Sequence, residues 1–116
     1  SDLGEIAAAK YGDNVNIIVY TGGCKSWKTK GISSKTNQIY QVKDGGLVRL
    51  EDNMGSGVMT DKKTLTEFIK YCAGRYPANR AELILWDHGG GSLTGFGYDE
   101  KKANSSSMTL SKYCPY

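Results

Sequence analysis

Hydrophobic residues in this sequence gather in two short runs that are separated by a long and mostly polar stretch. The first run, Val15 to Tyr20, consists largely of β-branched and aromatic residues between turn-forming segments, which predicts a buried strand. The second run, Ala81 to Trp86, has the pattern of a strand that is covered on both faces, as in parallel sheets. The two runs therefore predict two core strands.

The stretch between the two runs contains the clearest helical pattern of the chain. Thr60 or Asp61 can serve as its N-cap, and Pro77 ends it. Its apolar residues recur at helical spacing. They are Leu65, Phe68, Ile69, Cys72 and Tyr76. A shorter helical pattern around Leu3 and Ile6 predicts the last turns of a helix before the first strand.

Two further short strands are predicted in the polar stretch. Gln38 to Val42 and Leu47 to Leu50 flank Asp44-Gly45-Gly46, whose glycines can adopt positive φ, and this arrangement indicates a peripheral β-hairpin. Polar, glycine-containing loops are predicted before and after it, at Lys25 to Asn37 and Glu51 to Val58.

A strand, a helical crossover and a second strand form a βαβ unit, in which the two strands are parallel. We therefore expect an α/β fold with a mostly parallel sheet flanked by helices. Sites in such sheets form just beyond the carboxyl ends of the strands. Here these ends are Thr21 to Cys24 and Asp87 to Gly91.

Size and charge narrow the function classes. The chain has 116 residues, of which 39% are hydrophobic and 23% charged, which suits one globular domain or a part of one. No apolar run is long enough for a membrane span. The net charge of +3 is spread along the chain and only Lys25 to Lys35 is locally basic, so we expect no nucleic-acid partner.

The three cysteines are widely spaced and include no C-x-x-C pair, so we expect neither a structural metal nor a disulfide framework. Cys72 falls on the apolar face of the predicted helix, where a free cysteine packs as a small hydrophobe. Cys24 follows a strand end and is a conceivable nucleophile. Cys114 has no preceding hydrophobic strand to hold it rigidly, which argues against a catalytic role.

His88 is the only histidine, and it directly follows the second core strand. An imidazole exchanges protons near neutral pH, and the backbone N–H groups of the glycines after it can approach a reacting carbonyl oxygen. These are two parts of an acyl-transfer site. A histidine that only caps a strand end is the alternative. Neighbouring residues of a strand point to opposite faces, so we expect Asp87 to have a structural role rather than to orient His88.

The residues Trp86-Asp87-His88-Gly89-Gly90-Gly91, followed by Gly95-Phe96-Gly97-Tyr98-Asp99, resemble the clostripain family of cysteine peptidases, which are relatives of caspases. Asn16 to Tyr20 is similar to a core strand of that family, and Met108 to Ser111 to the start of its next helix. The resemblance implies a caspase-like fold, of which residues 1–116 are an incomplete part of a single peptidase domain.

The resemblance also implies roles for individual residues. His88 would be the catalytic histidine, and the N–H group of Gly89 would contribute to the oxyanion hole. Cleavage would follow Arg or Lys of peptide or protein substrates. The nucleophilic cysteine would end a strand after the Met108 helix, which lies outside the 116 residues.

Relatives of this family are made as one chain and processed into light and heavy pieces. Lys102-Ala103 lies in a basic, small-residue segment and would be a suitable self-cleavage bond. The expected partner is then a heavy chain from the same precursor. The alternative is that Lys101 and Lys102 are simply solvated charges of a loop. Only the family resemblance implies a secreted or cell-envelope location. The residues predict no cofactor, although the resemblance leaves a dependence on calcium possible. A catalytically inactive peptide-binding relative and a caspase-like peptidase of other specificity remain as alternatives.

Overall fold

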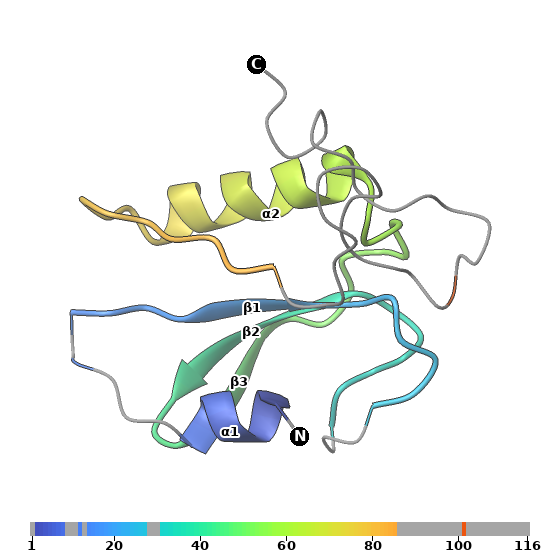
Figure 1. The fold of residues 1–116 in the computed structure, drawn as a ribbon, viewed down its shortest axis with the longest axis horizontal. Helices are drawn as coiled ribbons and strands as arrows, with labels where there is room; N and C mark the ends of the chain where they lie inside the picture. Colours follow the sequence, from blue (N-terminus) through green and yellow to red (C-terminus); the bar gives the residue numbers. More distant parts are fainter. Residues whose placement is uncertain (1, 9–11, 13, 28–30, 86–100, 102–116) are drawn as a thin grey trace. The chain divides into compact units, whose positions relative to one another are not determined.

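The computed structural model describes residues 2–8, 12, 14–27, 31–85 and 101. The chain divides into two compact units, Ser1–Ser56 and Gly57–Tyr116, and each is described here by itself. The elements of both units are labelled in Figure 1. They are α1 (Asp2–Ala8), β1 (Ile18–Thr21), β2 (Gln38–Lys43), β3 (Gly46–Glu51) and α2 (Lys62–Arg75).

The first unit is built on a three-stranded sheet in the order β1-β2-β3, in which both strand pairs are antiparallel (Figure 1). In the β1–β2 pair, Thr21 at the carboxyl end of β1 lies opposite Gln38 at the start of β2. The end of β1 and the open end of the β2–β3 hairpin therefore lie together.

The hairpin turn shows why this part of the sequence folds locally. Asp44 and Gly45 have φ values of 53° and 76°, so both central residues are left-handed, as the twist of a two-residue hairpin requires. The register of β3 shifts between Ile39 and Tyr40, where Leu50 is the extra residue. The predicted hairpin is confirmed, with Asp44 rather than Gly46 taking the second positive φ.

The central strand β2 carries the buried core of this unit. Gln38, Ile39 and Tyr40 are all buried although they alternate between the two faces of the sheet, so both faces are covered at this end. Helix α1 lies against β2 and β3, and its Ala7 is buried. The short helix expected around Leu3 and Ile6 is confirmed, and it packs on the sheet.

The second unit contains α2, whose limits follow from its capping residues. The N-cap is Asp61, whose Oδ1 accepts a hydrogen bond from the backbone N–H of Lys63 at 2.9 Å. At the other end the N–H of Tyr76 donates to the Cys72 carbonyl oxygen at 2.7 Å, and Pro77 cannot continue the helix. The predicted helix is confirmed, with Asp61 as the N-cap, although Ile69 of its apolar face is 47% exposed.

The parallel arrangement predicted from the sequence does not appear in the described residues. Residues 81–85 form no strand, and Ile84 is 74% exposed. The described sheet is antiparallel, and the hairpin supplies two of its three strands instead of lying at its periphery. A hydrophobic pattern indicates that a segment can be buried in a sheet, but it does not indicate which strand the segment pairs with. A two-residue turn, in contrast, brings two neighbouring strands together at a low cost in chain entropy. No described helix is long and apolar enough to cross a membrane.

Candidate active site

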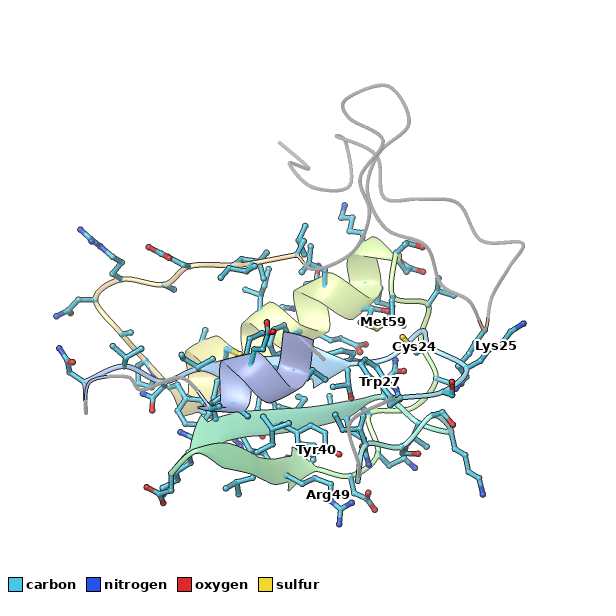
Figure 2. The ribbon with its side chains drawn as sticks, turned by 60° about the horizontal axis from the view of Figure 1, so that its bottom comes forward. Cys24, Lys25, Trp27, Tyr40, Arg49 and Met59 are labelled. Atoms are coloured by element: carbon cyan, nitrogen blue, oxygen red, sulfur yellow. The ribbon has the colours of Figure 1, made fainter. Side chains whose placement is uncertain are left out.

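The carboxyl end of β1 is the one predicted site position that the structure describes. Thr21 is buried, and its Oγ1 donates to the Gln38 carbonyl oxygen at 3.4 Å. Gly23 follows with a φ of 74°, which turns the chain out of the strand. Cys24 comes next and is half-buried and not part of a disulfide, and Lys25 and Trp27 lie in the same segment after β1 (Figure 2).

A buried polar cluster adjoins this strand end. The Gln38 side chain is 1% exposed, and its Oε1 accepts from the Ser33 N–H at 3.0 Å. The Tyr40 hydroxyl lies 2.5 Å from the same Oε1 and 3.2 Å from the Gly31 carbonyl oxygen. The Gln38 Nε2 donates in the other direction, to Asp52. One glutamine thus connects the segment before the hairpin with the segment after it.

Backbone hydrogen bonds join the same two segments. The N–H of Asn37 donates to the Gly55 carbonyl oxygen, and the N–H of Met54 donates to the Asn37 carbonyl oxygen, each at 2.7 Å. The Thr36 Oγ1 donates to the Asp52 carbonyl oxygen at 3.0 Å. The two segments therefore form one hydrogen-bonded layer at the end of the sheet where Thr21 leaves β1.

The electrostatics of this cluster centre on Tyr40. Burial raises the pKa of its phenol above the ordinary value of 10.0, the nearby Arg49 guanidinium opposes that rise, and the Asp52 carboxylate adds to it. Arg49 and Asp52 pair at 3.5 Å, with side chains 52% and 77% exposed, so water screens this ion pair strongly. Tyr40 is therefore a neutral hydrogen-bond donor at physiological pH.

Cys72 in the second unit has the properties of a packing residue. It is a free thiol on α2, and burial raises its pKa. A raised pKa lowers the fraction of thiolate, which is the nucleophilic form. This environment supports the predicted packing role of Cys72 and opposes a catalytic one.

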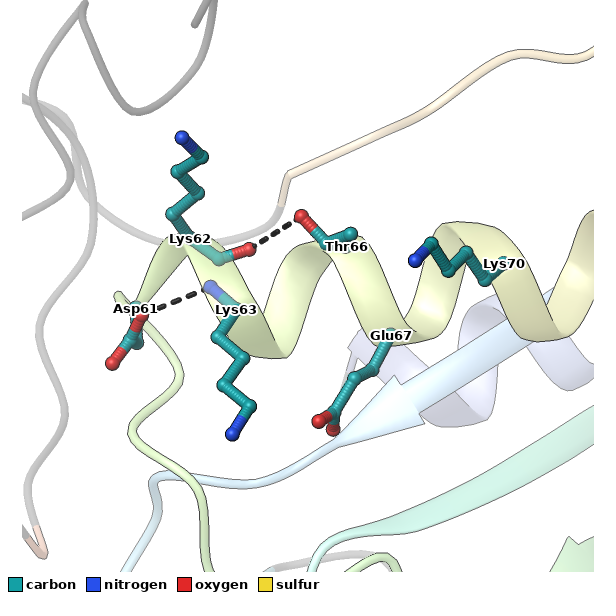
Figure 3. A pocket seen from close by; sticks show the side chains of 6 residues that line it. All are labelled: Asp61, Lys62, Lys63, Thr66, Glu67 and Lys70. Atoms are coloured by element: carbon teal, nitrogen blue, oxygen red, sulfur yellow. Dashed lines mark hydrogen bonds between the residues drawn. The ribbon is translucent and has the colours of Figure 1, made fainter.

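An open depression on the surface of α2 is lined by charged and polar side chains (Figure 3). They are Asp61, Lys62, Lys63, Thr66, Glu67 and Lys70. The Asp61 carboxylate already caps the helix, and the Thr66 Oγ1 donates to the Lys62 carbonyl oxygen at 2.9 Å. The depression is a solvated helix face. Within the described part of the chain, no three metal-binding side chains are grouped closely enough for a metal ion.

The remaining site predictions fall on residues outside the described ranges. His88, Gly89, Lys102 and Ala103 are among them, and so are Asp87 and Cys114. Sequence reasoning did not find the Gln38 cluster, because it treated the hairpin as peripheral. A signal was present, since Gln38 is a polar residue two positions before Tyr40 and thus shares its face of the strand.

The family model described as "Clostripain family" matches residues 1–111, which is most of the chain. No curated protein and no solved structure shows significant similarity to this chain.

Proposed function

Because this chain belongs to the clostripain family of cysteine peptidases, we propose that it is part of an endopeptidase that cleaves after Arg or Lys through a covalent acyl-enzyme. The match over residues 1–111 carries the proposal, because it includes Trp86 to Gly91, where a histidine and three glycines follow an apolar run. Peptides and proteins are the substrates that membership of a peptidase family implies.

In the proposed mechanism, a cysteine thiolate attacks the carbonyl carbon of the scissile peptide bond. The oxygen becomes an oxyanion, which the N–H group of Gly89 stabilises. The C–N bond then breaks as His88, protonated by the thiol, gives its proton to the leaving amine. Water, deprotonated by His88, attacks the thioester and releases the carboxylic acid and the thiol.

We assign the nucleophile to a cysteine outside the 116 residues. Cys72 is a helix residue whose burial raises its pKa, which disfavours the thiolate. Cys24 lies at the predicted end of the sheet, but it precedes the histidine motif in the chain, whereas the family resemblance places the nucleophile at the end of the strand that follows that motif. Self-cleavage at Lys102-Ala103, association with a heavy chain of the same precursor, and a secreted or cell-envelope location belong to the same proposal.

Active-site labelling tests the proposal on the full-length protein. The probe is a peptidyl acyloxymethyl ketone ending in lysine, and the control is the same peptide ending in aspartate. Peptide mapping by mass spectrometry then locates the adduct. One labelled cysteine outside residues 1–116, found only with the lysine probe, supports both the specificity and the nucleophile. Labelling at Cys24 refutes the nucleophile, labelling with the aspartate probe refutes the specificity, and a folded but unlabelled protein refutes the activity.

The role of His88 needs a separate variant. His88→Ala is expected to lower kcat for a lysine-containing peptide by roughly 10²- to 10⁴-fold, the usual contribution of a general acid–base group. The matched control is Cys72→Ala in the described helix, which should keep nearly full activity. A fully active His88→Ala enzyme would exclude His88 from the reaction.

A further inference from the structure

The tip of the β2–β3 hairpin consists of an aspartate that is followed directly by a glycine. Asp44 and Gly45 are the two residues between the strands, and both are exposed. Their φ values of 53° and 76° are left-handed. Among the residues that the structure describes, Asp44 is the one non-glycine residue with a positive φ. The turn therefore presents to solvent a carboxyl group whose chain neighbour has no side chain.

The peptide group between Asp44 and Gly45 is not held by other groups. Within residues 31–85, neither its carbonyl oxygen nor its N–H makes a hydrogen bond, and the Asp44 carboxylate has no hydrogen bond or ion pair. A Cβ at Gly45 would meet no atom within 4 Å, so the space around this residue is open. The peptide plane can therefore rotate toward the Asp44 side chain without breaking a hydrogen bond.

Two other aspartates in the same range are restrained, unlike Asp44. The Asp52 Oδ1 accepts a hydrogen bond from the Gln38 Nε2 at 2.9 Å, and the Asp61 Oδ1 accepts one from the Lys63 N–H at 2.9 Å. Each of these two aspartates is also followed by a residue with a side chain, which hinders approach to its backbone nitrogen. Only at Asp44 do an unrestrained carboxyl group and an uncovered amide nitrogen occur together.

We propose that Asp44-Gly45 is a site at which the folded protein isomerises to isoaspartate, and that this change weakens the hairpin. The Gly45 nitrogen attacks Cγ of the protonated Asp44 carboxyl group. A C–N bond forms, and the carboxyl hydroxyl leaves as water with the proton of the N–H, which closes a succinimide ring. Water then opens the ring. Attack at Cγ restores aspartate, whereas attack at the Asp44 main-chain carbonyl carbon gives isoaspartate.

Isomerisation lengthens the main chain inside a two-residue turn. In isoaspartate the chain runs through Cβ and Cγ, which inserts one extra carbon between the Asp44 Cα and the Gly45 nitrogen. Lys43 is paired with Gly46 across the turn. Turn length fixes the register of a hairpin, so the longer turn disturbs the pairs beside it. Because β2 and β3 are two of the three strands of the sheet, the modified protein should unfold more easily.

Ageing of the full-length protein tests the site. The folded protein is incubated at mildly acidic pH, where more of the carboxyl group is protonated, and is then digested. Isoaspartate is detected by enzymatic methylation with S-adenosylmethionine and located by mass spectrometry. We expect methylation at residue 44 that rises with time, preceded by a succinimide lighter by one water. Methylation should be absent at Asp52 and Asp61, and equal methylation at either of them would refute the role of the unrestrained turn.

An unfolded sample separates the effect of the structure from that of the dipeptide. The same protein is aged in parallel in guanidinium chloride, which removes the hairpin. The proposal requires isomerisation at residue 44 in the folded sample as well as in the unfolded one. If the reaction occurs only in the unfolded sample, the fold protects this site and the proposal is wrong.

Two variants that keep the turn provide matched controls. Asp44→Gly removes the carboxyl group, and Asp44→Asn replaces it with an amide, which loses ammonia instead of water. Glycine and asparagine both adopt a left-handed φ readily, so the hairpin is retained. Asp44→Asn should form isoaspartate faster than the wild type at neutral pH, and Asp44→Gly should lose the methylation signal. An unchanged signal in Asp44→Gly would place the reaction elsewhere and overturn the assignment.

Stability measurements test the consequence for the hairpin. Hydrophobic-interaction chromatography separates the isoaspartate form from unmodified protein, and urea denaturation is followed for each. The isoaspartate form should have the lower urea midpoint, and equal midpoints would refute the weakening of the hairpin. These readouts do not use peptidase activity, so they decide the proposal independently of the proposed function.

Discussion

The Gln38 Nε2 lies 3.1 Å from the carbonyl oxygen of Asp52 and 2.9 Å from its Oδ1. Asp52 directly follows β3, whereas Gln38 begins β2, so this contact closes the open end of the hairpin opposite its turn. Both segments that leave the hairpin at this end are therefore tied to a single buried side chain. This explains how two polar, glycine-containing loops reach a defined conformation beside the end of β1.

A pair of glycine substitutions tests the backbone geometry. A Cβ at Gly45 or at Gly74 would meet no other atom within 4 Å, so conformation alone decides the effect. Gly45→Ala should lower the free energy of unfolding by about 1–2 kcal/mol, because its φ of 76° is left-handed. Gly74→Ala, inside α2, should raise it by about 0.5–1 kcal/mol. Urea denaturation measures both changes. If the two substitutions changed the free energy of unfolding in the same direction, the turn geometry would be contradicted.

The N-cap of α2 gives a second prediction. Asp61→Ala should lower the free energy of unfolding by about 1 kcal/mol, because the Lys63 N–H loses its acceptor. Asp61→Asn retains a side-chain oxygen at this position and should be close to the wild type. Chemical denaturation of the three proteins provides the measurement. An equal loss in both variants would show that the negative charge, and not the capping hydrogen bond, stabilises the helix.

The burial of Tyr40 predicts a loss of stability at alkaline pH. Its folded pKa is raised above the unfolded value of 10.0, so its contribution to stability is fully present below pH 10. Between pH 10 and the folded pKa the unfolded state releases the proton first, and stability falls as pH rises. In Tyr40→Phe this part of the pH dependence should disappear. Urea midpoints measured on either side of pH 10 check this, and identical slopes in the two proteins would contradict it.

The proposed self-cleavage makes a fourth prediction. Lys102→Ala in the full-length precursor should abolish cleavage of the Lys102-Ala103 bond, because the proposed specificity requires a basic residue before that bond. Lys101→Ala is the matched control and should leave cleavage unchanged. Intact mass spectrometry of the purified proteins gives the answer directly. Cutting of the same bond in Lys102→Ala with unchanged yield would rule out self-processing at this position.

Local patterns in the sequence were sufficient for the elements that depend on neighbouring residues. The cap at Asp61 and the stop at Pro77 define α2, and Asp44-Gly45 defines the hairpin turn. In each case residues only a few positions apart make the deciding interaction, so the sequence contains the necessary information. The family is also determined by the sequence, through the match over residues 1–111.

Strand pairing and burial depended on contacts between distant residues. The sequence predicted that Ala81 to Trp86 would be a buried strand parallel to β1, whereas the structure pairs β1 with β2 and leaves Ile84 exposed. The hydrophobic pattern did not predict that Gln38 would be buried and would bond to both Ser33 and Asp52. A hydrophobic pattern measures the tendency of a segment to leave water, but the partner that covers it is set by the whole chain. The sequence by itself therefore determined the helix, the hairpin and the family, and only the tertiary structure decided the sheet order and the buried polar cluster.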